Sequence, residues 1–385
     1  MVPSLCTFLT TAAALTATVH SLPQDGSYGG GFGSSTTSSF AIASASSTAS
    51  AAASTSTTAC NNSPDLCSRS YNNITHMGAH DSAFLRDSST SNSIAGNQYY
   101  NATVALSAGL RLLQAQVHDK DGAIELCHTS CDLLDAGTLE SWLTDIKSWM
   151  DDNPNEVVTL LLVNSDDKDV SDFGTVFSDS GIDKYGYTPS GSSWPTLQEM
   201  ISADTRLVTF IASITTSTSY PYLLSEFDHV FETAYDVTSL SGFNCTLDRP
   251  STQSSASAAI TAGFMPLINH FKYNLLLASI EVPDVDNITT TNSPSTATTG
   301  NLGLHAQDCN QQWGTKPTFV LVDFFNVGPA VQTADNLNGI TAVGRTTVSQ
   351  TTTAVTTATA GPRRHGLGVG AGALVAFLVA VLVLA

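Results

Sequence analysis

The central part of the chain alternates short aliphatic and β-branched runs with stretches that have helical periodicity. Such runs occupy residues 74–79, 112–117, 157–164, 207–212, 230–234, 265–269 and 318–323. The run at 157–164 is apolar almost throughout, which is typical of a strand that helices cover on both faces. Strands that alternate with helices usually pair in parallel. The sequence therefore predicts an α/β fold built on a parallel sheet.

The clearest predicted helix covers residues 138–150, whose apolar residues recur every three to four positions before Asn153-Pro154 ends the pattern. A second helix is predicted from Pro195 toward the run at 207–212. The domain that contains these elements is bounded at residues 60–342. Its length of about 280 residues fits one α/β barrel as readily as two ordinary domains.

The two ends of the chain have the composition of processing signals. Residues 1–21 contain an apolar stretch bounded by small residues, which favours a secretory signal peptide over a spanning helix. Residues 362–385 start with a short basic segment and continue as an uncharged run, as in a GPI-attachment propeptide. A retained tail anchor is the alternative. We expect attachment within residues 354–361, and a secreted protein on the extracellular face of the plasma membrane or in the cell wall.

Two segments rich in Ser, Thr and Ala separate these ends from the central domain. Residues 22–59 and 343–361 hold too little apolar bulk to offset the entropy of ordering, so both are predicted to be disordered. In a secreted chain such segments are often O-glycosylated, and 343–361 is expected to be a Thr-rich stalk.

Six cysteines lie outside the predicted signal peptide, and an even number in a secreted chain favours disulfides. Proximity favours the pairs 60–67 and 127–131, which leaves 245–309, although about fifteen pairings are possible. A zinc site that includes His128 is the competing interpretation of the second pair, and secretion argues against it. The six residues are Cys60, Cys67, Cys127, Cys131, Cys245 and Cys309.

The net charge of −19 argues against nucleic acid as a partner, and no basic stripe is present to bind anionic lipid heads. Five glycosylation sequons agree with secretion. They begin at Asn61, Asn73, Asn101, Asn244 and Asn287. Pro64 weakens the first of them, and the second is expected to be buried in a strand.

Two histidines follow short strand-like runs, His80 in Gly-Ala-His-Asp-Ser and His128 in Leu-Cys-His-Thr-Ser-Cys. The residues before His128 predict a hairpin or a strand extension. In barrel enzymes, polar groups just after the strands meet at one end of the barrel. Two imidazoles in one pocket could act as an acid/base pair on a phosphodiester. Other polar residues at such ends are Asp81, Gln116, His118, Asn269, His270 and Asp323.

In these motifs the chain resembles the secreted fungal, PLC-like phosphodiesterases of the phosphatidylinositol-specific phospholipase C superfamily. The similarity covers nearly all of residues 60–340. It includes NNITHMGAHDSAF, RLLQAQVHD, LCHTSCDLLDAG, NPNEVVTLLL, WPTLQEMI and FVLVDFFNVG. The resemblance implies a single-domain, irregular TIM-type barrel that acts on a phospholipid or a glycosylphosphatidylinositol.

The resemblance also implies a role for each catalytic residue. His80 is the general base, and His128 is the general acid that protonates the leaving oxygen. Asp323 orients the base, and Asp81 supports the acid. A carboxylate on the second ring nitrogen of a histidine fixes the tautomer.

This chain departs from the family pattern at the residues that neutralise the negative charge of the phosphate. Bacterial relatives have an arginine on the second strand, and eukaryotic relatives have calcium-binding carboxylates there. This chain has Gln114 and Gln116, which are poor ligands for a hard cation, so no metal and no cofactor are predicted. Besides a protonated His128, the candidates for substrate binding are Gln116, Arg249, His118 and His270.

Two of these residues also have an interpretation without a role in function. Arg249 could be a solvated loop residue, and His270 could be a strand-end histidine satisfied by backbone. For the whole protein, we predict a monomeric phosphoric diester hydrolase. The alternatives are a non-catalytic surface or wall binding protein on the same barrel, and a barrel glycosidase, which would need two facing carboxylates.

Overall fold

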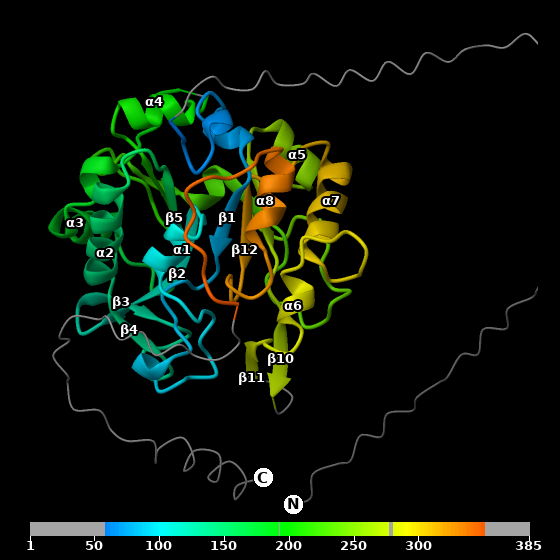
Figure 1. Cartoon of the computed structure of the whole chain (residues 1–385). Coiled ribbons are helices and arrows are strands. Elements are labelled where there is room, and N and C mark those ends of the chain that lie inside the picture. Colours follow the sequence, from blue (N-terminus) through cyan, green and yellow to red (C-terminus); the bar gives the residue numbers. More distant parts are fainter. Residues whose placement is uncertain (1–57, 192, 277–279, 351–385) are drawn as a thin grey trace, which may run out of the picture. The chain divides into compact units, whose positions relative to one another are not determined.

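The computed structural model describes residues 58–191, 193–276 and 280–350. Eight parallel strands form its central sheet in the order β7-β6-β5-β2-β1-β12-β9-β8 (Figure 1). They are β1 (His76–Ala79), β2 (Leu112–Lys120), β5 (Val158–Asn164), β6 (Leu207–Ala212), β7 (Leu223–Ser225), β8 (Val230–Glu232), β9 (Met265–Asn269) and β12 (Phe319–Val322). Apart from β7 and β8, each of the eight strands pairs with the next one in chain order, and β12 pairs with β1, as in a (β/α) barrel. The barrel is irregular because, among the described residues, β7 and β8 do not pair.

The barrel has two apolar layers because successive side chains of a strand point to opposite faces. Leu112 and Phe319 belong to the cluster that fills the inside. Their chain neighbours Leu113 and Val320 belong to a second cluster, which includes Leu143 from a covering helix. The predicted α/β barrel is therefore confirmed, with both faces of the sheet buried.

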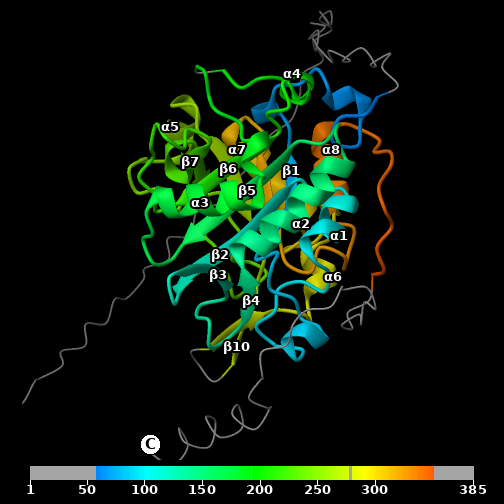
Figure 2. The same ribbon diagram turned by 90° about the vertical axis from the view of Figure 1, so that its left-hand side faces the viewer.

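Helices lie outside the sheet, and α2 and α3 cover the face formed by β2, β5 and β6 (Figure 2). The predicted helix at 138–150 is α2, which begins after Thr138, whose side chain accepts a hydrogen bond from the Ser141 N–H. The helices are α1 (Ala102–Ser107), α2 (Leu139–Asp152), α3 (Val170–Ser180), α4 (Leu197–Ser202), α5 (Ala256–Thr261), α6 (Ile288–Thr291), α7 (Leu302–Trp313) and α8 (Val331–Asn338).

Two antiparallel additions extend the carboxyl end of the barrel. Strand β2 continues past the predicted residue 117 and pairs with β3 (Ala123–Cys127), which pairs with β4 (Asp135–Thr138). A separate hairpin consists of β10 (Tyr273–Leu276) and β11 (Ile280–Pro283). The hairpin interpretation of the segment before His128 is thus confirmed.

The folded part extends beyond the predicted boundary at residue 342. Arg345 forms an ion pair with Asp335 of α8 at 2.6 Å, and the Thr346 N–H donates to the Ser107 carbonyl. The first residues of the predicted stalk therefore pack on the barrel. The predicted signal peptide (1–21), the rest of the stalk and the propeptide (362–385) lie outside the described residues, as does nearly all of 22–59. Within the described ranges, no helix has the length and apolarity needed to cross a membrane.

Candidate active site

The two predicted catalytic histidines face each other across one carboxylate. His80 follows β1 and His128 follows β3. The Nε2 atoms of His80 and His128 lie 3.5 Å and 3.3 Å from the same Oδ2 atom of Asp81. The Nδ1 atom of His80 lies 2.9 Å from Oδ1 of Asp323. Four residues from three separate sequence motifs therefore share one site, and the two rings are close enough for a single phosphate to contact both.

The alternation of side chains along the strands explains why these residues meet. On β2 the inward series begins at Leu112 and continues with Gln114 and Gln116, and on β12 it leads from Phe319 to Asp323. Where the apolar interior ends, at the carboxyl ends of the strands, the same inward positions carry polar groups. The site is thus the polar continuation of the barrel core.

The Gly-Ala-His-Asp motif fits the local backbone. Gly78 lies against strand β2, and a Cβ atom at this position would come within 2.7 Å of the Leu112 side chain. Asp81 has a φ of 45°, in the left-handed region, so the chain turns sharply after His80. This turn brings the Asp81 carboxylate back to Nε2 of His80, at 3.5 Å.

Gln114 and Gln116 each hold the residue that follows one of the histidines. The Gln114 Oε1 atom accepts a hydrogen bond from the Asp81 N–H at 2.6 Å, and Gln116 Oε1 accepts from the Thr129 N–H. A backbone N–H can only donate, so the amide oxygens must point toward it. The two side chains therefore fix both histidine loops to β2.

This arrangement bears on calcium, which takes several oxygen ligands, often carboxylates. The two side-chain oxygens that β2 offers here already accept backbone hydrogen bonds. The donor set at Gln114 and Gln116 therefore does not fit a hard cation. The prediction of a metal-independent site stays a prediction.

Three residues that the sequence did not single out complete the surroundings of His80. The Phe271 ring is stacked on the imidazole at 3.6 Å with an angle of 8° between the planes. The Asn97 side-chain amide donates to Asp323 Oδ1 at 3.1 Å, and Gln98 donates to the His80 carbonyl at 2.7 Å. Phe271 lies two residues beyond β9, which is a position that strand alternation could have identified. Asn97 and Gln98 lie in a loop without periodicity.

The charges at the site alter its protonation. Burial lowers the pKa of His80, but Asp81 and Asp323 more than offset this, so the pKa is raised above its ordinary value. Burial raises the pKa of Asp81, and His80 and His128 lower it below its ordinary value. For Asp323 burial dominates, and the pKa is raised. His80 therefore holds a proton to higher pH than an ordinary histidine.

Arg249 is bound to Glu232, the last residue of β8. Its Nε atom lies 3.1 Å from Glu232 Oε2, and its guanidinium lies over the Tyr235 ring at 4.4 Å. Glu232 is buried and is one of the charges that raise the pKa of His80. Beside it, burial and the Glu232 charge raise the pKa of Glu226 well above its ordinary value. Arg249 thus neutralises the buried Glu232 carboxylate near the site, and the solvated-loop alternative does not describe it.

His118 lies on the part of β2 that pairs with β3, beyond the end of β5. Its Nδ1 atom lies 3.2 Å from Oδ1 of Asp166, a residue just after β5. The structure therefore brings His118 to Asp166 at the outer part of the hairpin, with no contact to the histidine pair among the interactions of the described residues.

The structure corrects the prediction that His270 binds substrate. Asn269 points inward and donates to Glu232 Oε2 at 3.3 Å, so its neighbour His270 points outward. His270 is fully buried, with its Nδ1 2.9 Å from His305 Nδ1 and its Nε2 2.9 Å from the Thr291 carbonyl. Burial, reinforced by His305, holds the pKa of His270 well below its ordinary value. The alternative of a satisfied strand-end histidine describes its place.

The six cysteines form the pairs that sequence proximity favours: Cys60–Cys67, Cys127–Cys131 and Cys245–Cys309. The second disulfide closes the loop that carries His128. Metal-like spacing occurs where His305 approaches Cys245 and Cys309, but both sulfurs belong to a disulfide and cannot act as thiolates. The zinc interpretation of the Cys127 motif fails for the same reason.

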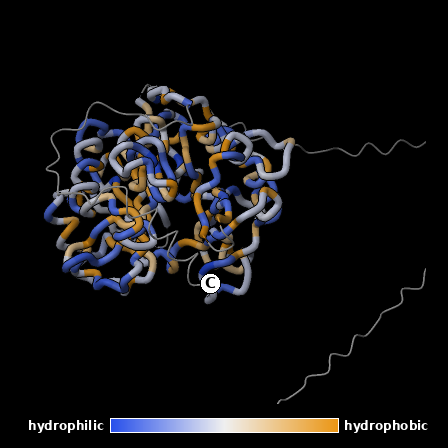
Figure 3. The backbone as a smooth tube through the Cα atoms, turned by 90° about the horizontal axis from the view of Figure 1, so that it is seen from below, coloured by the Kyte–Doolittle hydropathy of each residue, from blue (hydrophilic) through white to orange (hydrophobic). Residues whose placement is uncertain are grey.

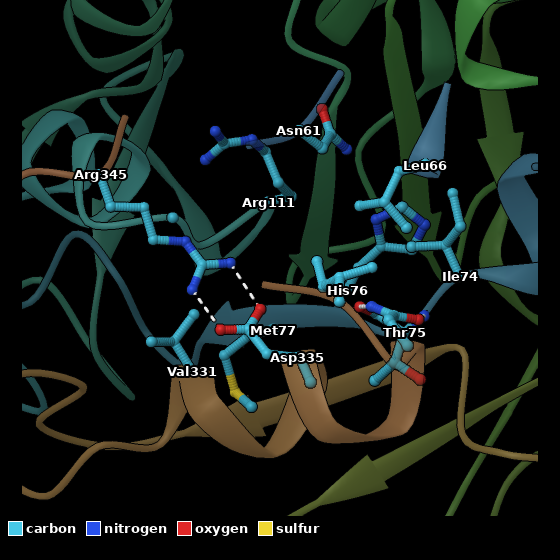
Figure 4. Close-up of a pocket in the computed structure, with 14 residues that line it drawn as sticks. Asn61, Leu66, Ile74, Thr75, His76, Met77, Arg111, Val331, Asp335 and Arg345 are labelled. Atoms are coloured by element: carbon cyan, nitrogen blue, oxygen red, sulfur yellow. Dashed lines mark hydrogen bonds and ion pairs between the residues drawn. The ribbon is translucent and has the colours of Figure 1, made fainter. Parts of the chain in front are cut away.

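A small cavity lies at the opposite end of the barrel, between β1 and α8 (Figure 4). His76 and Arg111 contribute to its lining, and the Arg345–Asp335 ion pair closes one side. Its volume of about 20 Å³ has room for roughly one water molecule. A larger cavity of about 220 Å³ lies beside the Cys245–Cys309 disulfide. Neither cavity is lined by His80 or His128, so neither belongs to the site.

Comparison with known proteins identifies the family to which the chain is similar. The family model described as PI-PLC X matches residues 66–338. A curated protein of Arthroderma benhamiae, "PI-PLC X domain-containing protein 1", is 36% identical over 287 residues, which cover 73% of this chain and 90% of that protein. A second protein of that organism, named "Uncharacterized secreted protein", is 37% identical over 298 residues. The match covers 74% of this chain and 65% of that relative, so the chain spans less than two thirds of its length.

Comparison with solved structures found two bacterial proteins of low sequence identity. The phosphatidylinositol-specific phospholipase C of Listeria monocytogenes shares 14% identity at a TM-score of 0.42, with 71% of this chain and 96% of that chain covered. The enzyme of Staphylococcus aureus, in a mutant form, shares 13% identity at a TM-score of 0.41, with 70% and 94% covered.

Proposed function

The chain belongs to the PI-PLC X domain family, and from this we propose that it is a phosphodiesterase of the phospholipase C class that cleaves an inositol-containing phospholipid or a glycosylphosphatidylinositol. The observation that carries the proposal is the sharing of one Asp81 oxygen by the Nε2 atoms of His80 and His128, at 3.5 Å and 3.3 Å. Two imidazoles that face one point can take up and deliver a proton on either side of a phosphorus atom.

The geometry supports one assignment of roles. Asp323 accepts a hydrogen bond from Nδ1 of His80, which leaves the lone pair of Nε2 free to take a proton from a substrate hydroxyl. The hydroxyl oxygen bonds to the neighbouring phosphorus, and the bond from phosphorus to the leaving oxygen breaks. His128 delivers its Nε2 proton to that oxygen, which replaces Asp81 Oδ2 as the partner of this nitrogen. The products are a cyclic phosphate and an alcohol.

The negative charge of the phosphate requires a donor, because Arg249 is committed to Glu232. We assign this role to a protonated His128 and to the side-chain N–H groups of Gln116. With Oε1 of Gln116 fixed on the Thr129 N–H, the NH₂ group is fixed too. A preorganised donor of this kind costs no reorganisation during reaction.

Replacing Gln116 with glutamate tests this role. A carboxylate still accepts the hydrogen bond of the Thr129 N–H but places a negative oxygen where the amide donates. Since a hydrogen bond to a charged group contributes about 1.5–3 kcal/mol, we expect Gln116→Glu to lower kcat/KM by roughly 10- to 100-fold. Wild-type kcat/KM in Gln116→Glu, with a loss in Gln116→Ala, would show that Gln116 only supports the loop.

The direct test of function is product analysis. The protein is incubated with vesicles that contain phosphatidylinositol, and the water-soluble product is identified by ³¹P NMR. We expect the signal of a five-membered cyclic phosphate. A linear monoester as the first product would contradict the proposed attack by a substrate hydroxyl, and complete absence of turnover on both substrate classes would favour the binding-protein alternative.

One observation favours that alternative, a non-catalytic surface protein. Strand β2 presents no cation to the site, because glutamines occupy its inward positions. Binding of inositol phosphate without turnover would support it. The glycosidase alternative has weaker support, because Asp81 and Asp323 both pair with imidazoles, whereas a glycosidase needs a carboxyl group that protonates the leaving oxygen.

For location, we propose a secreted protein that a GPI anchor holds at the cell surface. The support is the composition of residues 1–21 and 362–385. Release of the protein from intact cells by an added bacterial phosphatidylinositol-specific phospholipase C would support the anchor. Retention after this treatment would favour the tail-anchor alternative.

A further inference from the structure

The five glycosylation sequons differ in how the fold surrounds their asparagines. Asn61 is buried, and its side-chain oxygen accepts the N–H of Val157 at 2.7 Å. Asn287 is half-buried, and its side-chain amide donates to Asp284 at 2.8 Å. A glycan is bulky and needs to project into solvent. Attachment to the side-chain nitrogen of Asn61 would displace part of the fold, and attachment to Asn287 would crowd its contact with Asp284.

The other three asparagines, Asn73, Asn101 and Asn244, are exposed. The structure corrects the expectation that Asn73 is buried in a strand, because this residue ends the short 3-10 helix Tyr71–Asn73 outside the sheet. Asn101 precedes α1, and it is the side-chain oxygen, not the nitrogen, that accepts the Val104 N–H. These three positions can therefore carry a glycan without loss of the fold.

Asn244 borders the larger of the two cavities described above, whose volume is about 220 Å³. The lining residues come from segment 240–245, which follows β8, and from residues 299–312, which include most of α7. The volume is several times the roughly 30 Å³ that one water molecule takes in the liquid, so the cavity has room for a small organic group. Figure 1 shows α7 at the right of the barrel, and Figure 3 shows this side from below, with hydrophilic and hydrophobic segments interleaved.

The lining of this cavity contains both polar and apolar groups. Asp308 and Gln312 lie one turn apart on α7, and both are exposed. A carboxylate accepts hydrogen bonds from hydroxyl groups, and a side-chain amide can both donate and accept. Phe243 and Leu304 add half-buried apolar surface. A sugar residue has hydroxyl groups at its edges and C–H groups on its ring, so it matches a lining of this kind.

The charges of the lining favour a neutral ligand. Asp308 is its one carboxylate and His305 is its one histidine. Burial lowers the pKa of His305 to about 4, so this ring is uncharged at neutral pH. An anionic ligand would therefore meet a carboxylate and no cation among the residues that line the cavity, whereas a neutral, hydroxylated ligand would meet no repulsion.

Contacts on both sides of Asn244 hold its backbone in place. The Phe243 ring is stacked on the buried His270 ring at 4.0 Å, and Cys245 is joined by its disulfide to Cys309 of α7. An exposed asparagine between two such anchors has a defined position. A group that is attached to Asn244 is therefore held beside α7.

The side chain of Asn244 is held as well. Its Nδ2 atom donates to the Gly242 carbonyl at 3.0 Å, and its Oδ1 atom accepts the Thr246 N–H at 2.9 Å. The amide nitrogen carries two hydrogens, and a glycan replaces one of them, so the contact with Gly242 can persist. The same amide that lines the cavity thus remains available for attachment.

We propose that Asn244 carries an N-linked glycan whose first sugar residue occupies the cavity beside α7. Nδ2 of Asn244 forms a bond to C1 of a sugar that a lipid-linked diphosphate donates. The bond from C1 to the diphosphate oxygen breaks, the lipid diphosphate leaves with the electron pair, and the amide nitrogen loses one proton. This inference rests on the proposed secretion and is independent of the proposed catalysis.

The first part of the test is the occupancy of each sequon. The full-length protein is secreted from a eukaryotic host that adds N-linked glycans, and its glycopeptides are identified by mass spectrometry. We expect glycans on Asn244 and Asn73, and none on Asn61. Thr246→Ala removes the sequon but keeps Asn244 and should leave this position unmodified, whereas Thr246→Ser should keep the glycan.

The second part is the placement of the first sugar. An amidase that hydrolyses the side-chain amide of a glycosylated asparagine should release the glycan from Asn244 of the folded protein at least tenfold more slowly than from Asn73. After denaturation the two rates should be equal. Asp308→Ala/Gln312→Ala should speed release from Asn244, and Gln311→Ala, which changes an exposed neighbour on α7 outside the lining, is the matched control.

The outcomes are distinct. A secreted protein whose Asn244 is unmodified overturns the proposal. Equal release from Asn244 and Asn73 in the folded protein overturns the placement in the cavity, because the sugar then lies in solvent. A chain that is not secreted contradicts the proposed location and this inference together. Loss of turnover on inositol phosphodiesters contradicts only the proposed function, because neither occupancy nor release depends on activity.

Discussion

Replacing His80 or His128 with alanine is expected to lower kcat for phosphatidylinositol cleavage by about 10²- to 10⁴-fold in each case. Each ring faces the same Asp81 oxygen, and each is proposed to transfer one of the two protons in the reaction. Since the two act in one step, the double variant should lose much less than the product of the single losses. The measurement is kcat and KM on phosphatidylinositol dispersed in detergent.

The leaving group separates the two roles. A substrate with a nitrophenyl leaving group needs little help from an acid, so His128→Ala should recover most of its rate on it, whereas His80→Ala should not. His229, which precedes β8 at the opposite end of the barrel, offers a histidine control outside the site. Wild-type turnover in both single variants would refute the proposed roles, and recovery of His80→Ala alone would show that the roles are reversed.

Replacing Asp323 with asparagine is expected to lower kcat/KM by about 100-fold and to change its pH dependence. The Asp323 carboxylate lies 2.9 Å from Nδ1 of His80, and it fixes the tautomer in which Nε2 can accept a proton. An amide can present an N–H to Nδ1 instead, which favours the wrong tautomer. Geometry would be preserved while the base function is lost.

The direction of the pH shift follows from the charges. Burial lowers the pKa of His80, whereas Asp81 and Asp323 raise it above its ordinary value. His80 acts as a base only when neutral, so activity of the wild type rises with pH through this raised pKa. Removing one negative charge lowers the pKa, so Asp323→Asn should move the rise in kcat/KM to lower pH. If kcat/KM of Asp323→Asn rises over the same pH range as in the wild type, the ionisation of a group other than His80 controls this rise.

Asp81→Asn is the matched control for this shift. It also removes a negative charge beside His80, so the rise in kcat/KM should again move to lower pH. The contact of His80 with Asp323 is retained, so the tautomer should be unchanged. A shift shared by both variants, with the larger loss of rate in Asp323→Asn, would separate the effect of charge from the effect of tautomer.

Stability should respond in the opposite direction to activity. Burial raises the pKa of Asp323, so the contribution of this group to stability declines as the pH rises from its unfolded-state pKa to its folded-state pKa. At neutral pH the buried, ionised carboxylate of Asp323 lowers the free energy of unfolding, and a neutral amide avoids this loss. We therefore expect Asp323→Asn to unfold at the same or a higher temperature than the wild type, which would also show that its loss of activity does not come from misfolding.

The barrel could be predicted from the sequence because most of its strands can be recognised from the composition of a few consecutive residues. Long apolar runs such as β5 and β6 are covered on both faces, and their composition alone identifies them. Strand β7 was missed because Leu223–Ser225 is only three residues long. No periodicity can be recognised in so short a segment, and only its pairing with β6 makes it a strand.

The candidate site was predicted in part. The residues that end strands β1 and β12 were found because position after a strand is a property of the sequence. His270 was a candidate for substrate binding with a satisfied strand-end histidine as the alternative, and its burial against His305 and Thr291 agrees with the alternative. The sequence could not decide between them, because a shift of one residue reverses the direction of a side chain. The sequence shows that Gln114 and Gln116 carry no charge, but their contacts with Asp81 and Thr129 could not be identified from it. These contacts depend on the conformation of the loops that follow β1 and β3.

Within the described residues, strands β7 and β8 do not pair with each other, and this has a consequence for the protein at high concentration. Both strands are only three residues long, and segment 248–249 bonds to the end of β8 through Glu232. Short and covered edges give a second copy too few free amide groups for strand addition. We expect the protein to resist fibril growth even at high local concentration, and prolonged incubation of a concentrated solution with thioflavin T should give no rise in fluorescence.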